Sequence, residues 1–116
     1  MTKVDIARLF SNGEFEKIYD FISEQSQWTV VGEETFVGKQ AIIANCKKVA
    51  QYFETVETRF TTLHAISDKD KVVIAGTAEF LRDNNRLSHV SGCDLYEFDN
   101  LDQIQSITSY CIYEKV

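Results

Sequence analysis

The sequence predicts an α+β fold in which three N-terminal helices pack against a curled antiparallel sheet. Two observations lead to this prediction. Apolar residues recur every three or four positions in most of the chain up to Phe53, as in amphipathic helices, and every second position after it, as in strands. A helical part followed by consecutive strands is typical of α+β proteins rather than of alternating α/β ones. The length of 116 residues favours one domain, residues 1–116.

The first two helices are predicted on either side of the sequence SNG at residues 11–13. Its Asn-Gly pair can adopt the left-handed conformation that ends a helix. Ser11 and Glu14 have the spacing of a capping box, which predicts that the second helix begins there. The apolar stripes of the two helices are Val4, Ala7 and Phe10, and then Phe15, Ile18, Tyr19 and Ile22.

A short strand and the longest helix are predicted next. The strand is QWTVVG at residues 27–32, and the helix begins near Lys39. The stripe of this third helix is Ile42, Ile43, Cys46, Val49, Ala50 and Phe53.

Four long strands complete the predicted sheet. Their separators DKD, DNN and DNLD are Asp- and Asn-rich hairpin signals, so the strands form a meander. A straight strand of this length would extend about 40 Å, whereas a compact chain of this size has a radius of gyration of about 13 Å. The sheet must therefore curl, with Gly76 and Gly92 as the bend and a pocket on its concave side. The predicted strands are 55–67, 71–82, 86–98 and 103–114.

Composition excludes several classes of partner. Hydrophobic residues make up 44% and charged residues 26%, which is ordinary for a globular domain. A net charge of −6 with scattered Lys and Arg argues against nucleic acid and against an anionic membrane as partners. No apolar run is long enough to span a bilayer, and the N-terminus does not resemble a secretory signal. We therefore expect a cytoplasmic protein.

The cysteines and histidines predict neither a disulfide framework nor a metal site. Cys46, Cys93 and Cys111 are odd in number and form no C-x-x-C pair, so we expect buried, reduced thiols. His64 and His89 lack the spacing of metal ligands. We expect no metal and no cofactor.

Asp94 is the candidate functional residue, because it places a carboxylate in the most apolar part of a predicted strand, GCDLYEFDN. If Asn84 and Asn85 form the hairpin loop, Asp94 lies opposite Ala75, and small neighbours leave open volume in front of it. An ion in such surroundings loses hydration, so its pKa should rise unless donors or a cation face it. If Lys69-Asp70 is the loop of the hairpin before it, His64 pairs with Ala75. His64, Ala75 and Asp94 then form one row across three neighbouring strands, the Asp94 row.

Three interpretations of Asp94 remain open at this point. It can be functional, or it can be a structural carboxylate satisfied by a tyrosine hydroxyl or a backbone N–H. Alternatively, a bulge can swap the two faces of the strand and leave Asp94 exposed to solvent. The other candidates are large side chains that either fill the core or contact a ligand, and one small residue that faces Asp94. The candidate ligand-binding residues are Tyr19, Trp28, Phe53, Ala75, Tyr96 and Tyr110.

The order of elements is similar to that of the nuclear-transport-factor-2-like superfamily. LFSNGEFEKIYDFI leads into WTVVGEETFVGKQAI, then a longer helix, then a meander that ends in CDLYEFDNLDQIQSITSY. This arrangement most resembles the SnoaL-like branch of polyketide cyclases, with the steroid delta-isomerases nearby. The resemblance implies a cone-shaped α+β barrel, a pocket between sheet and helices, and a homodimer packed through the convex side of the sheet.

The resemblance also implies a role for Asp94. In the steroid isomerases the aspartate of this strand is a protonated acid of the oxyanion hole, and in the polyketide cyclases it resembles a general acid/base for aldol closure. The chain departs from the isomerases at two positions, since Ile6 replaces the oxyanion tyrosine and Val30 the general-base aspartate. Without a base, proton transfer between steroid carbons is not expected.

Three functions are therefore compatible with the sequence. The first is binding of a small apolar molecule in a pocket with one acidic residue. The second is a cofactor-free isomerase, cyclase or related lyase in which Asp94 transfers a proton on a small carbonyl compound. The third is a dimerisation module whose pocket is filled by its own aromatic side chains.

Overall fold

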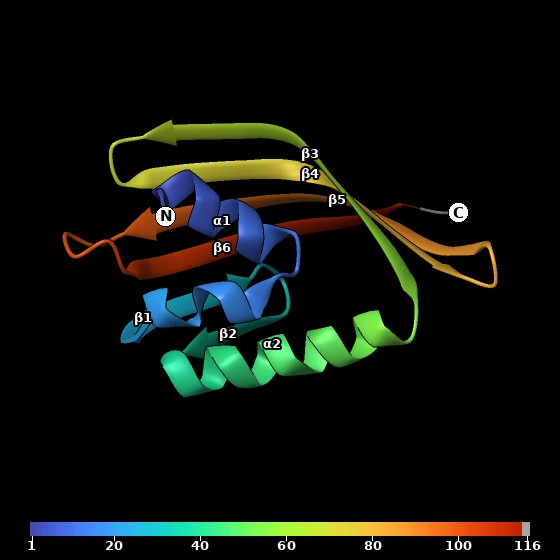
Figure 1. The fold of residues 1–116 in the computed structure, drawn as a ribbon, viewed down its shortest axis with the longest axis horizontal. Coiled ribbons are helices and arrows are strands. Elements are labelled where there is room, and N and C mark those ends of the chain that lie inside the picture. The colour runs from blue at the N-terminus through green and yellow to red at the C-terminus, as the bar shows by residue number, and fades with distance from the viewer. Residues whose placement is uncertain (115–116) are drawn as a thin grey trace.

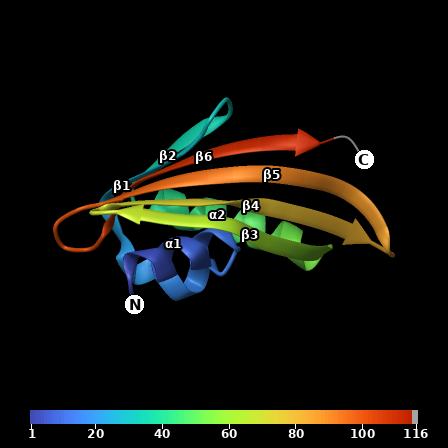
Figure 2. The ribbon, with the colours of Figure 1, turned by 90° about the horizontal axis from the view of Figure 1, so that it is seen from above.

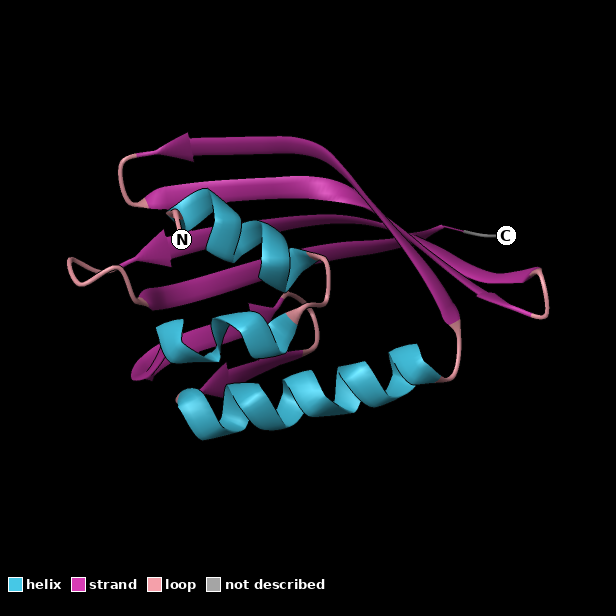
Figure 3. Ribbon diagram, in the orientation of Figure 1, coloured by secondary structure: helices cyan, strands magenta, loops and turns pink. Residues whose placement is uncertain are grey.

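The computed structural model describes residues 1–114 and confirms the α+β prediction, with helices packed on a curled sheet. Figures 1 and 3 show the helical segments gathered over one part of the sheet. The strand order is β2-β1-β6-β5-β4-β3, and every neighbouring pair is antiparallel except β1 and β6. The elements are α1 (Lys3–Ser11), the 3-10 helix η1 (Phe15–Phe21), β1 (Ile22–Val30), β2 (Glu34–Val37), α2 (Lys39–Glu54), β3 (Glu57–Asp68), β4 (Lys71–Arg82), β5 (Asn85–Phe98) and β6 (Ile104–Glu114).

Helix α1 begins and ends with local signals, but Ser11 does not have the predicted capping role. The capping box of α1 is formed by Thr2 and Asp5, whose side chains each bond the other's backbone N–H at 3.1 and 3.0 Å. Gly13 follows the helix with a positive φ, as predicted. The capping box predicted at Ser11 and Glu14 is wrong, because Ser11 is the last residue of α1 and its hydroxyl bonds side chains of β5.

Strand β2 extends the sheet beyond the prediction. The sequence predicted five strands, and the sixth is this four-residue segment, which pairs with β1 through contacts such as Trp28 with Phe36. Strand β1 itself starts at Ile22, directly after η1, and lies parallel to β6. Because β2 is short and largely exposed, its strand conformation depends on pairing rather than on a hydrophobic pattern of its own.

The register between β4 and β5 differs from the prediction by one residue. The hairpin loop is Asp83-Asn84, both with positive φ, instead of Asn84-Asn85. A register shift between Phe80 and Leu81 compensates part of this difference. Asp94 therefore lies opposite Ile74 and not opposite Ala75.

Gly76 and Gly92 lie directly opposite each other at the curl of the sheet. A Cβ atom on Gly76 would lie 2.2 Å from the carbonyl oxygen of Thr61, so the backbone of β3 passes too close for any side chain. Strand β3 has a register shift just beyond this point, between Thr62 and His64. Figure 2 shows the resulting twisted sheet with α1 on one side of it. The radius of gyration is 13.9 Å, as compactness requires.

The helices close only part of the concave side. Phe10 of α1 is buried at the centre of this contact, with its ring 5.1 Å from Phe15, 5.0 Å from Trp28 and 6.1 Å from Tyr96. Ile42 and Cys46 of α2 complete this core. The β4–β5 hairpin extends beyond the helices (Figure 3), which leaves concave surface uncovered. In residues 1–114, no helix combines the length and the apolar character that crossing a membrane requires.

Candidate functional site

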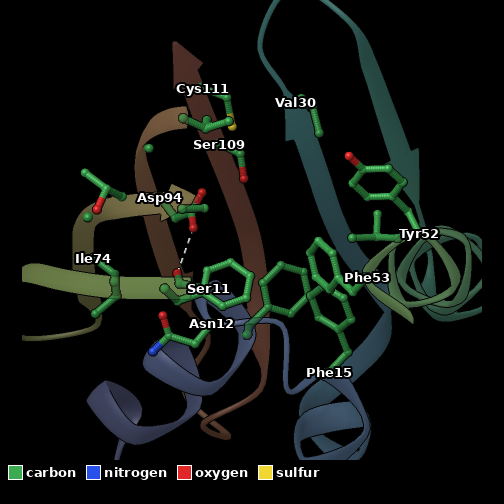
Figure 4. A pocket seen from close by; sticks show the side chains of 18 of the residues that line it. Ser11, Asn12, Phe15, Val30, Tyr52, Phe53, Ile74, Asp94, Ser109 and Cys111 are labelled. Carbon is green, nitrogen blue, oxygen red and sulfur yellow. Dashed lines mark hydrogen bonds between the residues drawn. The ribbon is translucent and has the colours of Figure 1, made fainter. Parts of the chain in front are cut away.

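A cavity of about 810 Å³ lies between the concave face of the sheet and the helices α1 and α2. Aromatic side chains form much of its wall, among them Phe15 of η1 and Phe53 of α2. Figure 4 shows these two rings on the helix side of the cavity, across from Asp94 and Ser109 on the sheet. Its volume lies in the range of small-molecule sites, about 300–1,000 Å³.

Asp94 reaches the cavity from β5 and is partly buried. The hydroxyl of Ser11, at the end of α1, donates to Oδ2 of Asp94 at 2.7 Å (Figure 4). Ser109 lies directly opposite Asp94 on β6 and is itself buried. The interpretation in which a bulge exposes Asp94 to solvent is therefore wrong, because β5 keeps this residue on the concave face.

The surroundings of Asp94 favour its protonated form. Burial raises the pKa of the Asp94 carboxyl above its usual value, and the hydroxyls of Ser11 and Ser109 partly offset this by stabilising the charged form. Burial, together with the nearby Asp94, holds the pKa of the Tyr96 phenol well above its ordinary value. No cation is among the causes that act on Asp94, so the rise in pKa that the sequence predicted is confirmed in direction.

Two buried aromatic side chains bond the two serines next to Asp94. The phenol oxygen of Tyr96, which is fully buried, lies 2.6 Å from Oγ of Ser11. The indole Nε1 of Trp28 donates to Oγ of Ser109 at 3.0 Å. An indole N–H can only donate, so the proton of Ser109 remains available for another acceptor. The Asp94 carboxyl group therefore lies between two hydrogen-bonded pairs, Tyr96 with Ser11 and Trp28 with Ser109.

The far wall of the cavity is a cluster of aromatic rings. Phe53 stacks on Phe80 with ring centres 5.8 Å apart and contacts Phe60 edge-on at 5.5 Å. Tyr52 packs on Phe80 at 5.8 Å. These rings come from α2, β3 and β4, so they form an apolar surface that a flat ligand could contact by stacking.

Charged groups other than Asp94 also line the cavity. Glu33 and Glu34, in the turn before β2 and at its first residue, and Lys48 on α2 are all exposed. The sequence predicted a single acidic residue, and the structure adds these two glutamates, which lie in water. Asp94 is the carboxyl group that lies against the apolar part of the wall.

The structure divides the predicted ligand-binding residues into two groups. Trp28 and Phe53 line the cavity, whereas Tyr96 is fully buried outside its lining and is connected to Asp94 through Ser11. Tyr19 lies in a separate, smaller groove between η1 and α2.

Ala75 and Tyr110 are not in the cavity. Both pair with Cys93, which is adjacent to Asp94 on β5 and points to the convex face. Placing Ala75 and Tyr110 at the pocket was therefore wrong. The one-residue change of register accounts for Ala75, and the alternation of β6, with Ser109 on the concave face, accounts for Tyr110.

His64 does not join Asp94. It pairs with Ala75 of β4, and Lys69-Asp70 forms the loop that connects β3 and β4, both as predicted. However, Asp94 lies in the row of Ile74, so His64 is exposed on the convex face. The prediction that His64 shares the Asp94 row is wrong, because it combined the correct register between β3 and β4 with an incorrect register between β4 and β5.

Ser11 and Ser109 are the site residues that sequence reasoning missed. Ser109 is two residues after the buried Ile107, so both side chains lie on the same face of β6. A serine among apolar residues of one face indicates a polar site, and this signal is present in the sequence. Ser11 gave no such signal, because its place after a helical stripe equally suits a cap.

The cysteines differ in their surroundings. All three are free thiols, and Cys46 is buried in the core, where burial raises its pKa to about 12. Cys93 is partly buried, and Cys111 is exposed and lines the cavity, so the prediction of buried thiols is wrong for Cys111. Within residues 1–114, no three His, Cys, Asp or Glu side chains are grouped in a way that could hold a metal ion.

Solved structures similar to this chain share its whole fold. An NTF2-like protein of unknown function from Cytophaga hutchinsonii is 31% identical, with 93% of this chain and 94% of that chain covered and a TM-score of 0.83. A SnoaL-like protein from Shewanella denitrificans, described as a proposed polyketide cyclase, is 13% identical, with 95% and 90% covered and a TM-score of 0.73. An LEH-like epoxide hydrolase from M. tuberculosis is 14% identical, with 95% and 82% covered and a TM-score of 0.70.

Among curated proteins, none matches the chain. The model of the SnoaL-like domain family matches residues 5–107, which include α1 from Asp5 onward, η1, α2, β1 to β5 and the first part of β6. The resemblance inferred from the order of elements is thereby confirmed, and the protein belongs to the SnoaL-like domain family.

Proposed function

We propose that the protein binds a small, largely apolar carbonyl compound in the cavity, with the Asp94 carboxyl group as its hydrogen-bond partner. The observation that carries this proposal is a single partly buried carboxyl at the wall of an aromatic cavity of about 810 Å³. A protonated carboxyl can donate to a carbonyl oxygen, and the raised pKa of Asp94 favours that form. The three free cysteines support the reducing cytoplasm as its compartment.

Gly92 offers a direct test of this proposal. It lines the cavity, and a Cβ atom on it would meet nothing closer than 3.9 Å, so a side chain can begin there without a clash with the neighbouring backbone. The probe is prodan, a neutral naphthyl ketone whose fluorescence shifts to the blue in apolar surroundings. We expect prodan to bind the wild-type protein with a blue shift and Gly92→Leu to weaken its binding at least about tenfold, or 1.4 kcal/mol.

Gly92→Ala is the matched control, because its methyl group fills little of the cavity. We expect the affinity for prodan to fall in the order wild type, Gly92→Ala, Gly92→Leu, with unchanged far-ultraviolet circular dichroism. Equal affinity in all three proteins would place the probe outside the cavity and contradict the proposal.

A catalytic use of Asp94 is the second candidate function, favoured by its proton and by the hydroxyl groups next to it. Val30 lines the cavity at the position where the steroid isomerases have a base, so abstraction of a carbon-bound proton has no group to perform it there. An intramolecular closure that needs one acid/base group remains the catalytic alternative. The third candidate, a module whose cavity is filled by its own rings, is disfavoured by the volume of the cavity.

We also propose that the protein forms a homodimer through the convex face of the sheet. Apolar side chains are exposed on this face, among them Ile66, Tyr110 and Ile112, at 59%, 49% and 67% exposure. Exposed apolar side chains gathered on one face are typical of an interface. Sedimentation velocity should give twice the chain mass of 13.3 kDa.

Ile112→Asp tests the dimer, because a carboxylate in an apolar interface is costly. It should give the mass of a single chain, whereas Leu101→Asp, which changes an exposed leucine in the β5–β6 turn, should remain dimeric. A wild-type protein that sediments as a single chain at high concentration would contradict the dimer.

A further inference from the structure

A chain of hydroxyl groups connects the deepest phenol of the core to Asp94. Tyr96 is fully buried, and its oxygen lies 2.6 Å from Oγ of Ser11, which lies 2.7 Å from Oδ2 of Asp94. In the part of the chain that the structure describes, Ser11 is the one hydrogen-bond partner of the Tyr96 hydroxyl. Tyr96 and Asp94 are on the same face of β5, and α1 brings Ser11 between them.

The hydrogen bonds that connect Tyr96, Ser11 and Asp94 have one favourable direction. A serine hydroxyl has a single proton, and that of Ser11 points to Oδ2 of Asp94. Ser11 can then only accept from Tyr96, so the phenol is the donor. The reversed order would leave the Tyr96 proton without an acceptor in a fully buried place, which is unfavourable.

We propose that Ser11 is a positioning residue through which Tyr96 fixes Oδ2 of Asp94 as a hydrogen-bond acceptor, so that the carboxyl proton resides on Oδ1. Oδ2 has two acceptor positions, and the Ser11 hydroxyl occupies one of them and makes this oxygen less basic, so Oδ1 is the better site for the proton. Oδ1 then presents the proton to a ligand. The inference rests on the proposed function, in which this proton faces a carbonyl compound.

The experiment measures the titration of Asp94 by carbon-13 NMR of its carboxyl group, without any ligand. Ser11→Ala removes the donor to the charged carboxylate, so the pKa of Asp94 should rise further above its usual value. Tyr96→Phe keeps the ring but leaves Ser11 without its donor, so the pKa should rise by less. The nearby titratable groups, Tyr96 and Cys111, have raised pKa values themselves and stay neutral while Asp94 titrates.

The double variant distinguishes a chain from two separate effects. If Tyr96 acts only through Ser11, the pKa of Asp94 in the Ser11→Ala/Tyr96→Phe protein equals that in Ser11→Ala. A further rise in the double variant would mean that Tyr96 acts on Asp94 independently, which would overturn the inference. Loss of thermal stability in Ser11→Ala without any change in the titration of Asp94 would assign Ser11 a purely structural role and would also overturn it.

Two more variants complete the design. Ser11→Thr keeps the hydroxyl and should retain the wild-type titration, and a titration like that of Ser11→Ala would contradict the role of this hydroxyl. Ser88→Ala removes another hydroxyl from the cavity wall on β5 and should leave the pKa of Asp94 unchanged. Because none of these measurements needs a ligand, they can fail while prodan still binds, and the reverse also holds.

Discussion

Gly76→Ala is expected to destabilise the folded protein by about 3 kcal/mol, the upper end of the cost of overpacking. The new methyl carbon would lie 2.2 Å from the carbonyl oxygen of Thr61, and backbone cannot move aside as a flexible side chain can. Strand β3 would have to shift away from β4 at the point where the sheet curls. Urea denaturation followed by circular dichroism measures this change as a lower midpoint.

Gly92→Ala is the matched control, because Gly92 lies directly opposite Gly76 in the neighbouring strand. Its Cβ atom would have space, and its φ is not in the left-handed region. Alanine there should be neutral or stabilise the protein by about 0.4–1 kcal/mol, because it reduces the freedom of the unfolded chain. Equal effects of the two substitutions would contradict the account of the curl, and with it the origin of the cavity.

Much of the fold could be predicted because the hydrophobic period distinguishes the helices from the four long strands that follow Phe53. Strand β4 has the predicted bounds, and the other long strands differ by one or two residues at their ends. The periodicity records which side of each element is buried, and that information is local. Strand β2 was missed because its four residues are held by pairing with β1, which is not a local property.

The register between β4 and β5 could not be predicted, because Asp83, Asn84 and Asn85 all tolerate a positive φ. The sequence DNN therefore allows two adjacent two-residue loops, and each gives a different set of opposite residues. The resulting one-residue error placed Ala75 opposite Asp94 and His64 in the same row, whereas the observed register puts both on the convex face. Asp94 itself was placed correctly, because its face follows from alternation within a single strand.

The hydroxyl groups at the site were beyond sequence reasoning for a different reason. Ser11 is 83 residues away from Asp94 in the chain, and only the packing of α1 on β5 brings the two together. No local pattern records such a contact. A polar partner for a buried carboxyl was expected in general, but its identity depends on tertiary structure.

Protonation of Asp94 links the site to the pH. The pKa of Asp94 is higher in the folded protein than in the unfolded chain, so the folded state binds the proton more tightly. The stability that this contributes is complete below the unfolded pKa of about 3.9. It is lost as the pH rises through the folded pKa. Binding of a carbonyl ligand should follow the same titration, because only the acid can donate to it.

Asp94→Asn separates this proton from other titrating groups. Its amide can donate at every pH, while the exposed Glu33 and Glu34 along the cavity remain unchanged. Any pH dependence that these glutamates cause should therefore appear equally in the variant. A dependence that is present in the wild-type protein and absent in Asp94→Asn belongs to Asp94.

The affinity for prodan as a function of pH is the most direct test of the claim that Asp94 is a protonated partner for a carbonyl ligand. We expect the affinity of the wild-type protein to fall at least about tenfold as the pH rises through the pKa of Asp94, because a carboxylate facing a carbonyl oxygen loses a hydrogen bond. The affinity of Asp94→Asn should stay constant over the same range. A wild-type affinity that does not change while Asp94 titrates would contradict the claim.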